Sequence, residues 1–168
     1  MRADVAVWSV EHTLINTTAA PLRCGIWDVL MLRRPAQVEV ALVDGADAAT
    51  ACREIAGKGR IDDLQRRGIV AVEGDRVVVN CRSAGQYKLG IAGANGEIRV
   101  GLDLPEGGFD YWRSAPAVAD VAYAHGHPVE VFNAPDLPYF EVESHSPLAT
   151  LAPSGRIVFT VHEGVTAR

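Results

Sequence analysis

Hydrophobic residues recur at every second position in many short segments of this chain. Residues 37–43, QVEVALV, form one such segment, and residues 4–17, DVAVWSVEHTLINT, form another. Side chains at alternate positions share one face of a β-strand, so this period predicts strands with one apolar face. Further segments of this kind cover residues 23–32, 69–81, 87–93, 97–104, 128–135, 139–146 and 156–164. The chain therefore predicts roughly nine or ten short strands, the spacing expected of a β-sandwich.

One stretch departs from this period. Residues 44–60, DGADAATACREIAGKGR, hold helix-forming residues between two glycine-rich edges. Asp47 is suitably placed to cap a helix over residues 48–56, and residues 61–68 predict a further helical turn. We therefore expect one short helical insert near residues 47–66, between strands.

Turn signals separate the other segments. Glu-Gly-Asp at residues 73–75 predicts a hairpin between two valine-rich strands, and Ala-Asn-Gly at residues 94–96 predicts a second hairpin. After residue 108 the pattern becomes irregular, so a loop is expected there. Together the pattern predicts an all-β, antiparallel sandwich that forms a single domain over residues 1–168.

Composition and charge argue against some classes of binding partner. The chain is 48% hydrophobic, which allows a core, and carries a formal net charge of −5. Its basic residues form no stripe, which argues against nucleic acid or an anionic membrane surface as the main partner. No apolar run approaches the ~18 residues of a membrane span, and the start lacks the pattern of a signal peptide. The three widely spaced cysteines favour reduced thiols in a cytoplasmic protein.

Residues 139–146, YFEVESHS, carry the strongest candidate chemistry. Glu141, Glu143 and His145 stand at every second position, so a strand would place them on one face, roughly 6.5–7 Å apart. Carboxylates accept hydrogen bonds from sugar hydroxyls, and a carboxylate with an imidazole can serve as general base and acid. The alternative is a solvated face, since alternating charges are also typical of a half-exposed antiparallel strand.

Three more positions could join this site. His12 shares a strand face with apolar residues, so it is either a hydrogen-bonded structural residue or an acid that faces the same site. Trp27 and Asp28 are neighbours in a predicted strand, so only one of them can face a cleft. Trp27 would serve as a stacking surface for a sugar or as a core residue, and Asp28 as a hydroxyl acceptor or an acid.

The irregular region offers two further pairs. Trp112 and Arg113 resemble the lip of a sugar site, although such a pair is equally common as a loop anchor. His125 and His127 have the spacing of a chelating pair on a strand, but Gly126 between them favours a loop and no third ligand is obvious. We therefore expect no metal ion and no cofactor.

Two longer segments resemble a known family. Residues 10–32, VEHTLINTTAAPLRCGIWDVLML, and residues 138–164, PYFEVESHSPLATLAPSGRIVFTVHEG, resemble segments of galactose mutarotase-like proteins, and YKLGI at residues 87–91 also fits. The resemblance is to uncharacterised bacterial members and spans most of residues 5–165. It implies an antiparallel β-supersandwich that binds a sugar on the concave face of a sheet.

The resemblance also assigns a role to one residue. Glu143 matches the general base of the aldose epimerases in this family. The segment that matches the strand of their catalytic histidine is GIWDV, residues 25–29, and it contains no histidine. The full supersandwich is longer than this chain, so the chain is expected to be short at its N-terminal side.

Three functions remain open at this point. The favoured one is a carbohydrate-binding mutarotase-like domain whose partner is a small-molecule sugar. The second is an active aldose 1-epimerase, an isomerase, with Glu143 as base and His12, His145 or Asp28 as acid. The third is a structural β-sandwich module or a truncated remnant. The candidate sugar-binding residues are Glu141, His145, Trp27, Asp28, Trp112 and Arg113. An exposed sheet edge would also allow a second copy of the chain to pair as a homodimer.

Overall fold

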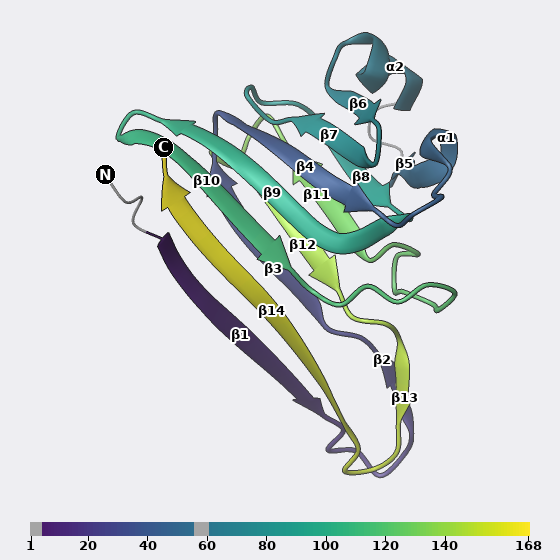
Figure 1. Cartoon of the computed structure of the whole chain (residues 1–168). Coiled ribbons are helices and arrows are strands. Elements are labelled where there is room, and N and C mark those ends of the chain that lie inside the picture. The colour runs from purple at the N-terminus through teal and green to yellow at the C-terminus, as the bar shows by residue number, and fades with distance from the viewer. Residues whose placement is uncertain (1–4, 56–60) are drawn as a thin grey trace.

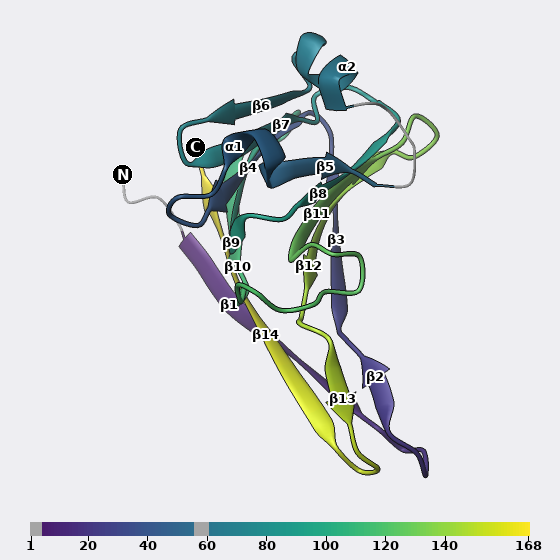
Figure 2. The same ribbon diagram turned by 90° about the vertical axis from the view of Figure 1, so that its right-hand side faces the viewer.

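Strands make up nearly all of the regular structure of this protein. The computed structural model describes residues 5–55 and 61–168, and the strand pairings within these ranges are antiparallel. The strands form two large sheets and a two-stranded ribbon. Figures 1 and 2 show the sheets as two layers, with the ribbon at one end and the short helices at the other.

The front layer in Figure 1 is a seven-stranded sheet. In spatial order its strands are β1 (Val5–Ile15), β14 (Arg156–Ala167), β10 (Gly107–Ser114), β9 (Ala94–Leu104), β4 (Ala36–Leu42), β7 (Arg76–Asn80) and β6 (Val70–Glu73). The first and last strands of the chain, β1 and β14, therefore lie side by side.

The second layer is a five-stranded sheet. In spatial order its strands are β3 (Trp27–Arg33), β12 (Tyr139–His145), β11 (Val129–Asn133), β8 (Tyr87–Ile91) and β5 (Cys52–Glu54). The ribbon pairs β13 (Ala149–Leu151) with β2 (Leu22–Cys24). The second layer carries the site described below, on the face that points away from the first layer.

The core lies between the two sheets. Val38 and Val40 of β4 are fully buried, as are Leu89 of β8 and Val131 of β11, and all four belong to one apolar cluster. Burial of a valine or leucine side chain stabilises a fold by about 1.5–3 kcal/mol. The alternation of the sequence therefore determines which face of each strand turns inward.

The sequence predicted this architecture. An antiparallel β-sandwich is confirmed. The segment 4–17 contains β1, and the segment 37–43 covers β4 except for its first residue, Ala36. The hairpin at residues 73–75 is also confirmed, since β6 pairs with β7 across it. The predicted strand 23–32 is interrupted at residues 25–26, so that β2 joins the ribbon and β3 joins the five-stranded sheet.

The helical insert is shorter than predicted. It contains α1 (Ala48–Ala51) and α2 (Ile61–Arg66), but the predicted helix over 48–56 is wrong at Cys52–Glu54, which form β5. Pairing with β8 supplies the backbone hydrogen bonds of that segment. Residue 56 lies outside the described residues. In the ranges that the structure covers, no helix is long and apolar enough to cross a membrane.

Two other local predictions are wrong. Residues 94–96 do not form a hairpin, because β8 and β9 belong to different sheets and the chain crosses between them at residues 92–93. Gly96 instead has a φ of 96° within β9, where a Cβ atom would lie 1.9 Å from the Ala115 carbonyl oxygen. Only glycine permits this bend and this close approach. The loop expected after residue 108 is wrong up to Ser114, where the chain forms the strand β10, and is confirmed for residues 115–128, which contain no helix or strand.

Candidate functional site

The register of three neighbouring strands determines which side chains meet on the outer face of the five-stranded sheet. Glu143 of β12 lies opposite Glu130 of β11, and His145 lies opposite Trp27 of β3. Phe140 and Val142 point the other way and are fully buried in the core. Glu141, Glu143 and His145 occupy alternate positions of the strand β12, so they share one face, as predicted.

Two of these three side chains do not face solvent, so the alternative of a solvated strand face does not apply to them. Glu143 is 0% exposed and His145 is 2% exposed, whereas Glu141 is half-buried. A carboxylate loses its hydration when it is buried, so it needs partners in the protein. Glu143 and His145 are therefore interior groups on what the sequence alone would describe as a solvent-facing strand.

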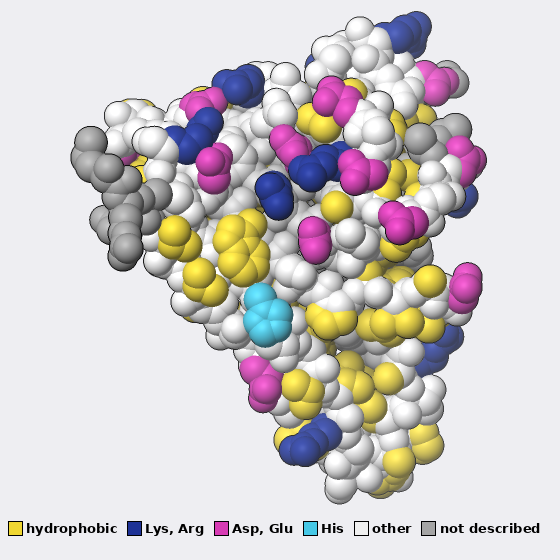
Figure 3. Space-filling view, viewed as in Figure 1, with side chains coloured by type: hydrophobic (Ala, Val, Ile, Leu, Met, Phe, Trp, Pro, Cys, Tyr) yellow, Lys and Arg dark blue, Asp and Glu magenta, His cyan; other side chains and the backbone are white. Residues whose placement is uncertain are grey.

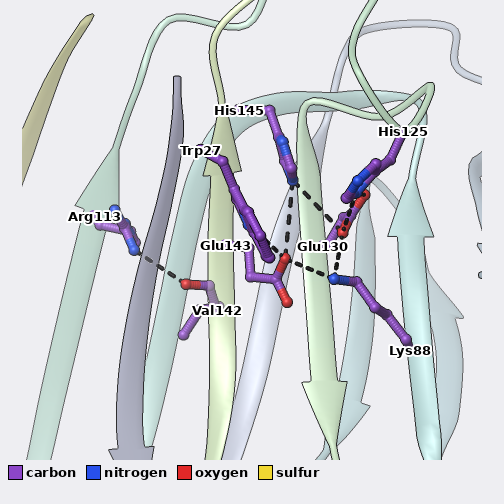
Figure 4. Close-up of polar contacts among 8 residues, drawn as sticks. All are labelled: Trp27, Lys88, Arg113, His125, Glu130, Val142, Glu143 and His145. Carbon is purple, nitrogen blue, oxygen red and sulfur yellow. Dashed lines mark hydrogen bonds and ion pairs between the residues drawn. The ribbon is translucent and has the colours of Figure 1, made fainter. Parts of the chain in front are cut away.

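Lys88 supplies the positive charge of the site (Figure 4). Its Nζ lies 3.0 Å from Glu143 Oε2 and 3.0 Å from Glu130 Oε2. The Trp27 indole donates a hydrogen bond from Nε1 to the same Glu143 oxygen, at 2.8 Å. Glu143 Oε2 thus has two donors, while Glu143 Oε1 is buried without a hydrogen-bond partner among the described residues.

Two imidazoles complete the group. His145 Nε2 lies 3.5 Å from Glu130 Oε2 and 3.9 Å from Glu143 Oε2. His125, from the segment between β10 and β11, places Nδ1 3.0 Å from Glu130 Oε1. The Trp27 ring stacks on His145 with centroids 6.0 Å apart and also meets the edge of His125. We call Trp27, Lys88, His125, Glu130, Glu143 and His145 the β12 cluster.

The two carboxylates of the β12 cluster have opposite pKa shifts. Burial raises the pKa of Glu143, and the Lys88 ammonium opposes this rise only in part. Burial also disfavours the charged form of Glu130, but its contacts with His145 and Lys88 outweigh this effect and hold its pKa below the ordinary value. Burial lowers the pKa of Lys88, but bonding to Glu130 and Glu143 outweighs it, so the net pKa is raised. Glu143 is thus the carboxylate whose proton affinity is increased.

Asp28 and His12 lie on the other side of this sheet. Asp28 pairs with Ser144, so it points between the sheets while its neighbour Trp27 points outward. His12 Nε2 lies 2.7 Å from Asp28 Oδ2, and the buried Arg113 bonds to the other oxygen of the same carboxylate. The structure therefore does not bring His12 or Asp28 to Glu143, because β12 itself lies between them.

Trp112 and Arg113 also do not join the β12 cluster. Both belong to β10 rather than to a loop lip. Arg113 is buried between the sheets and donates from Nη1 to the Val142 carbonyl oxygen, a contact drawn in Figure 4. Trp112 packs over Gly164 on the outer face of the seven-stranded sheet. That face holds a cavity of about 700 Å³ and carries charged and apolar side chains side by side (Figure 3).

Glu130 is the member of the β12 cluster that sequence reasoning missed. It sits in an alternating strand segment, PVEVF, where nothing distinguishes it from a solvated glutamate. Lys88 was assigned only to a strand, and His125 was considered only together with His127. The His127 ring instead lies over Gly90, where a Cβ atom would be 2.1 Å from it. Gly90, a glycine inside a predicted strand, was the sequence signal that another group packs closely against the backbone there.

Comparisons with known proteins give the fold. No protein-family model and no curated protein sequence matches the chain. A galactose mutarotase-like protein from Lactobacillus casei ATCC 334 superposes on 95% of the chain with a TM-score of 0.51 and 13% identity. A candidate aldose 1-epimerase from Escherichia coli K12 superposes on 96% of it with a TM-score of 0.45 and 14% identity. The chain spans 58% and 56% of these two proteins. The protein has the galactose mutarotase-like β-sandwich fold, as the sequence resemblance implied.

Proposed function

We propose that this protein binds a small-molecule carbohydrate on the outer face of the five-stranded sheet, at the β12 cluster. The observation that carries the proposal is Glu143, a fully buried carboxylate with one oxygen, Oε1, that has no hydrogen-bond partner in the described part of the chain. A buried oxygen of this kind costs free energy unless a ligand or a water satisfies it. A sugar hydroxyl is a donor suited to it.

Trp27 provides the apolar part of the proposed site. Its side chain is 52% exposed although its indole nitrogen bonds to Glu143. Binding sites for small ligands combine aromatic surface with a few fixed polar groups, and Trp27 lies beside the carboxylates and Lys88. The exposed indole face would carry the apolar face of a sugar ring, and the polar groups next to it would take the hydroxyls.

Access to Glu143 requires a movement of Trp27. The indole covers Glu143 Oε2 through its 2.8 Å hydrogen bond, so a ligand reaches the carboxylate when the ring turns aside. A sugar hydroxyl would then be able to donate to the unpartnered Glu143 Oε1. Lys88 would stay in place, because its ammonium also bonds to Glu130.

A catalytic version of this proposal is an aldose 1-epimerase with Glu143 as base. The raised pKa of Glu143 favours it, because a general base works best when its pKa is near the pH of the reaction. The position of the acid argues against it. His145 Nε2 lies only 3.9 Å from Glu143, which leaves no room for a sugar ring between them, and His12 lies on the other face of β12. Binding is therefore the function that the geometry supports best.

Ligand-detected NMR with a panel of aldoses tests the proposal. Saturation transfer should show binding of at least one aldose to the wild-type protein and its loss in Glu143→Gln, which keeps the shape of the side chain. Glu97→Gln is the matched control, because Glu97 is exposed on the seven-stranded sheet, where it lines the cavity on that sheet's outer face. Exchange spectra of the same samples measure anomer interconversion, and a rate equal to that of buffer removes the epimerase alternative. Absence of binding for the whole panel, or equal loss in both variants, contradicts the proposal.

A further inference from the structure

Three members of the β12 cluster have the donor set of a metal centre. We infer that His125, Glu130 and His145 form a binding site for a divalent transition-metal ion of the zinc class. Two imidazole nitrogens and one carboxylate oxygen are a combination that proteins use for zinc sites with an open coordination position. The inference does not depend on the carbohydrate proposal, because it concerns a different ligand that is tested without sugar.

The distances among the three side chains suit one ion. Their ligand atoms all lie within 4.8 Å of one another. One carboxylate oxygen, Glu130 Oε2, lies 3.2 Å from His125 Nδ1 and 3.5 Å from His145 Nε2. Ligand atoms at about 2.0–2.1 Å from a tetrahedral ion are separated by about 3.3 Å, so these two separations are close to that value. Small rotations of the two imidazole rings would bring the remaining pair, the ligand nitrogens of His125 and His145, to the same separation.

The state of His145 is a second, independent observation. Its side chain is 2% exposed, and its Nε2 has no hydrogen-bond partner within the described residues. Buried imidazole nitrogens are normally hydrogen-bonded, and the carboxylates at 3.5 Å and 3.9 Å are too far or too poorly aligned to bond to this one, so a further partner can satisfy it. A metal ion shared with His125 and Glu130 supplies that partner.

The charge of the β12 cluster also favours a cation. Two buried carboxylates, Glu130 and Glu143, share a single ammonium, Lys88, at 3.0 Å from each. Lys88 approaches Glu130 through Oε2, which leaves Oε1 directed toward His125. Since the His125 side chain is 42% exposed, an ion can enter from solvent and keep a water molecule at the fourth position.

The proposed site differs from the sequence-based expectation, which considered His125 with His127 and predicted no metal ion. His125 and His127 have the spacing of a chelating pair, but His127 lies over Gly90 and is not among the three grouped ligands. His125 meets His145 instead, with ring centroids 5.3 Å apart (Figure 4). This partner stands 20 positions further along the chain, on β12.

Zinc titration of chelator-treated protein tests the inference. Isothermal titration with Zn²⁺, in the absence of sugar, should give one equivalent bound by the wild-type protein, and Mg²⁺ should give no heat of binding. His125→Gln should weaken zinc binding at least tenfold and should fold normally, because His125 is partly exposed outside the strands. Co²⁺ should give visible absorption bands with the wild-type protein and lose them in His125→Gln.

Two control variants exclude other sources of binding. His162→Gln removes an exposed imidazole on β14, and Cys24→Ser removes the half-buried thiol, so both should retain the wild-type zinc affinity. Absence of zinc binding by the wild-type protein overturns the inference. So does a His125→Gln protein with unchanged affinity, or a loss of binding in Cys24→Ser or His162→Gln. None of these results affects the carbohydrate proposal, whose readout is sugar binding at Glu143.

Discussion

Glu130 and Glu143 are direct cross-strand partners on β11 and β12, and both are fully buried. Like charges at such positions repel, and burial strengthens the repulsion. The Lys88 ammonium, 3.0 Å from an oxygen of each carboxylate, offsets it. Lys88 therefore allows the two carboxylates to lie side by side on the outer face of the five-stranded sheet, where the proposed sugar would bind.

Removal of the ammonium should therefore destabilise the fold. Lys88→Met leaves two buried carboxylates facing each other and should lower the free energy of unfolding by roughly 3 kcal/mol at pH 7. The Lys88 ammonium lowers the pKa of both carboxylates, so its removal should raise both relative to wild type. The folded variant then takes up protons at higher pH than folded wild type does, so the stability deficit relative to wild type should shrink as the pH falls. Urea unfolding at a series of pH values measures it.

A double variant provides the control. Lys88→Met combined with Glu130→Gln removes one of the two like charges, so it should recover part of the stability lost in Lys88→Met at pH 7. A loss in Lys88→Met that is independent of pH and unaffected by Glu130→Gln would attribute the effect to packing of the lysine stem instead.

Arg113 should matter for stability but not for the sugar site. It is fully buried between the sheets, where it bonds to Asp28 and to the Val142 carbonyl. Arg113→Met leaves Asp28 without this partner and should lower the free energy of unfolding by roughly 3–5 kcal/mol. Arg33→Met, at an exposed pair, should change it little. Sugar binding by folded Arg113→Met should equal that of wild type, and a selective loss of binding would place Arg113 in the site.

The sequence predicted which side chains share a face of a strand, but not which side chains from different strands meet. Alternation along β12 correctly put Glu141, Glu143 and His145 on one face, because the side-chain period of a strand is local. Burial of Glu143 depends on Trp27 and Lys88, which lie on β3 and β8 and come together with it only through sheet pairing. No spacing in the chain encodes that neighbourhood.

The misplaced candidates have the same cause. Trp27 and Asp28 were correctly predicted to face opposite ways, but which of them faces the site depends on the register with β12. His12 lies on the inner face of β1, where its 2.7 Å contact with Asp28 reflects the approach of the two sheets. At residues 94–96, the Asn-Gly signal was overridden by the crossing between sheets, for which Gly96 provides a bend within β9.

Thiol reactivity should separate the three cysteines. Burial raises the pKa of Cys52 to about 12 and that of Cys81 to about 12, whereas Cys24 is half-buried. Since the thiolate is the reactive form, native protein should show one fast-reacting thiol with a disulfide reagent at pH 8 and all three after denaturation. Cys24→Ser should abolish the fast reaction. Fast modification of Cys52 or Cys81 in native protein would show that the core opens at those positions.

The edge strand β1 should support self-association. Val7 is 63% exposed, and Val5 and Ile15 are exposed on the same edge strand. An exposed apolar edge is a template for pairing with a second copy of the chain, and a lysine on such an edge prevents it. Sedimentation velocity should show dimers that dissociate on dilution, and Val7→Lys should shift the equilibrium toward monomer. A wild-type protein that is monomeric at all concentrations contradicts this prediction.

The indole signal of Trp27 tests the central claim most directly. The three tryptophans give separate indole resonances: Trp27 Nε1 bonds to Glu143, Trp8 Nε1 bonds to Glu163, and Trp112 lies on the outer face of the other sheet. In a ¹⁵N-labelled protein titrated with the aldose that binds, with Trp27→Phe used for assignment, the Trp27 resonance should shift in a saturable way and the Trp112 resonance should stay fixed. A Trp27 resonance that does not move at saturating sugar, or a shift confined to Trp112, would contradict the placement of the carbohydrate site at Glu143.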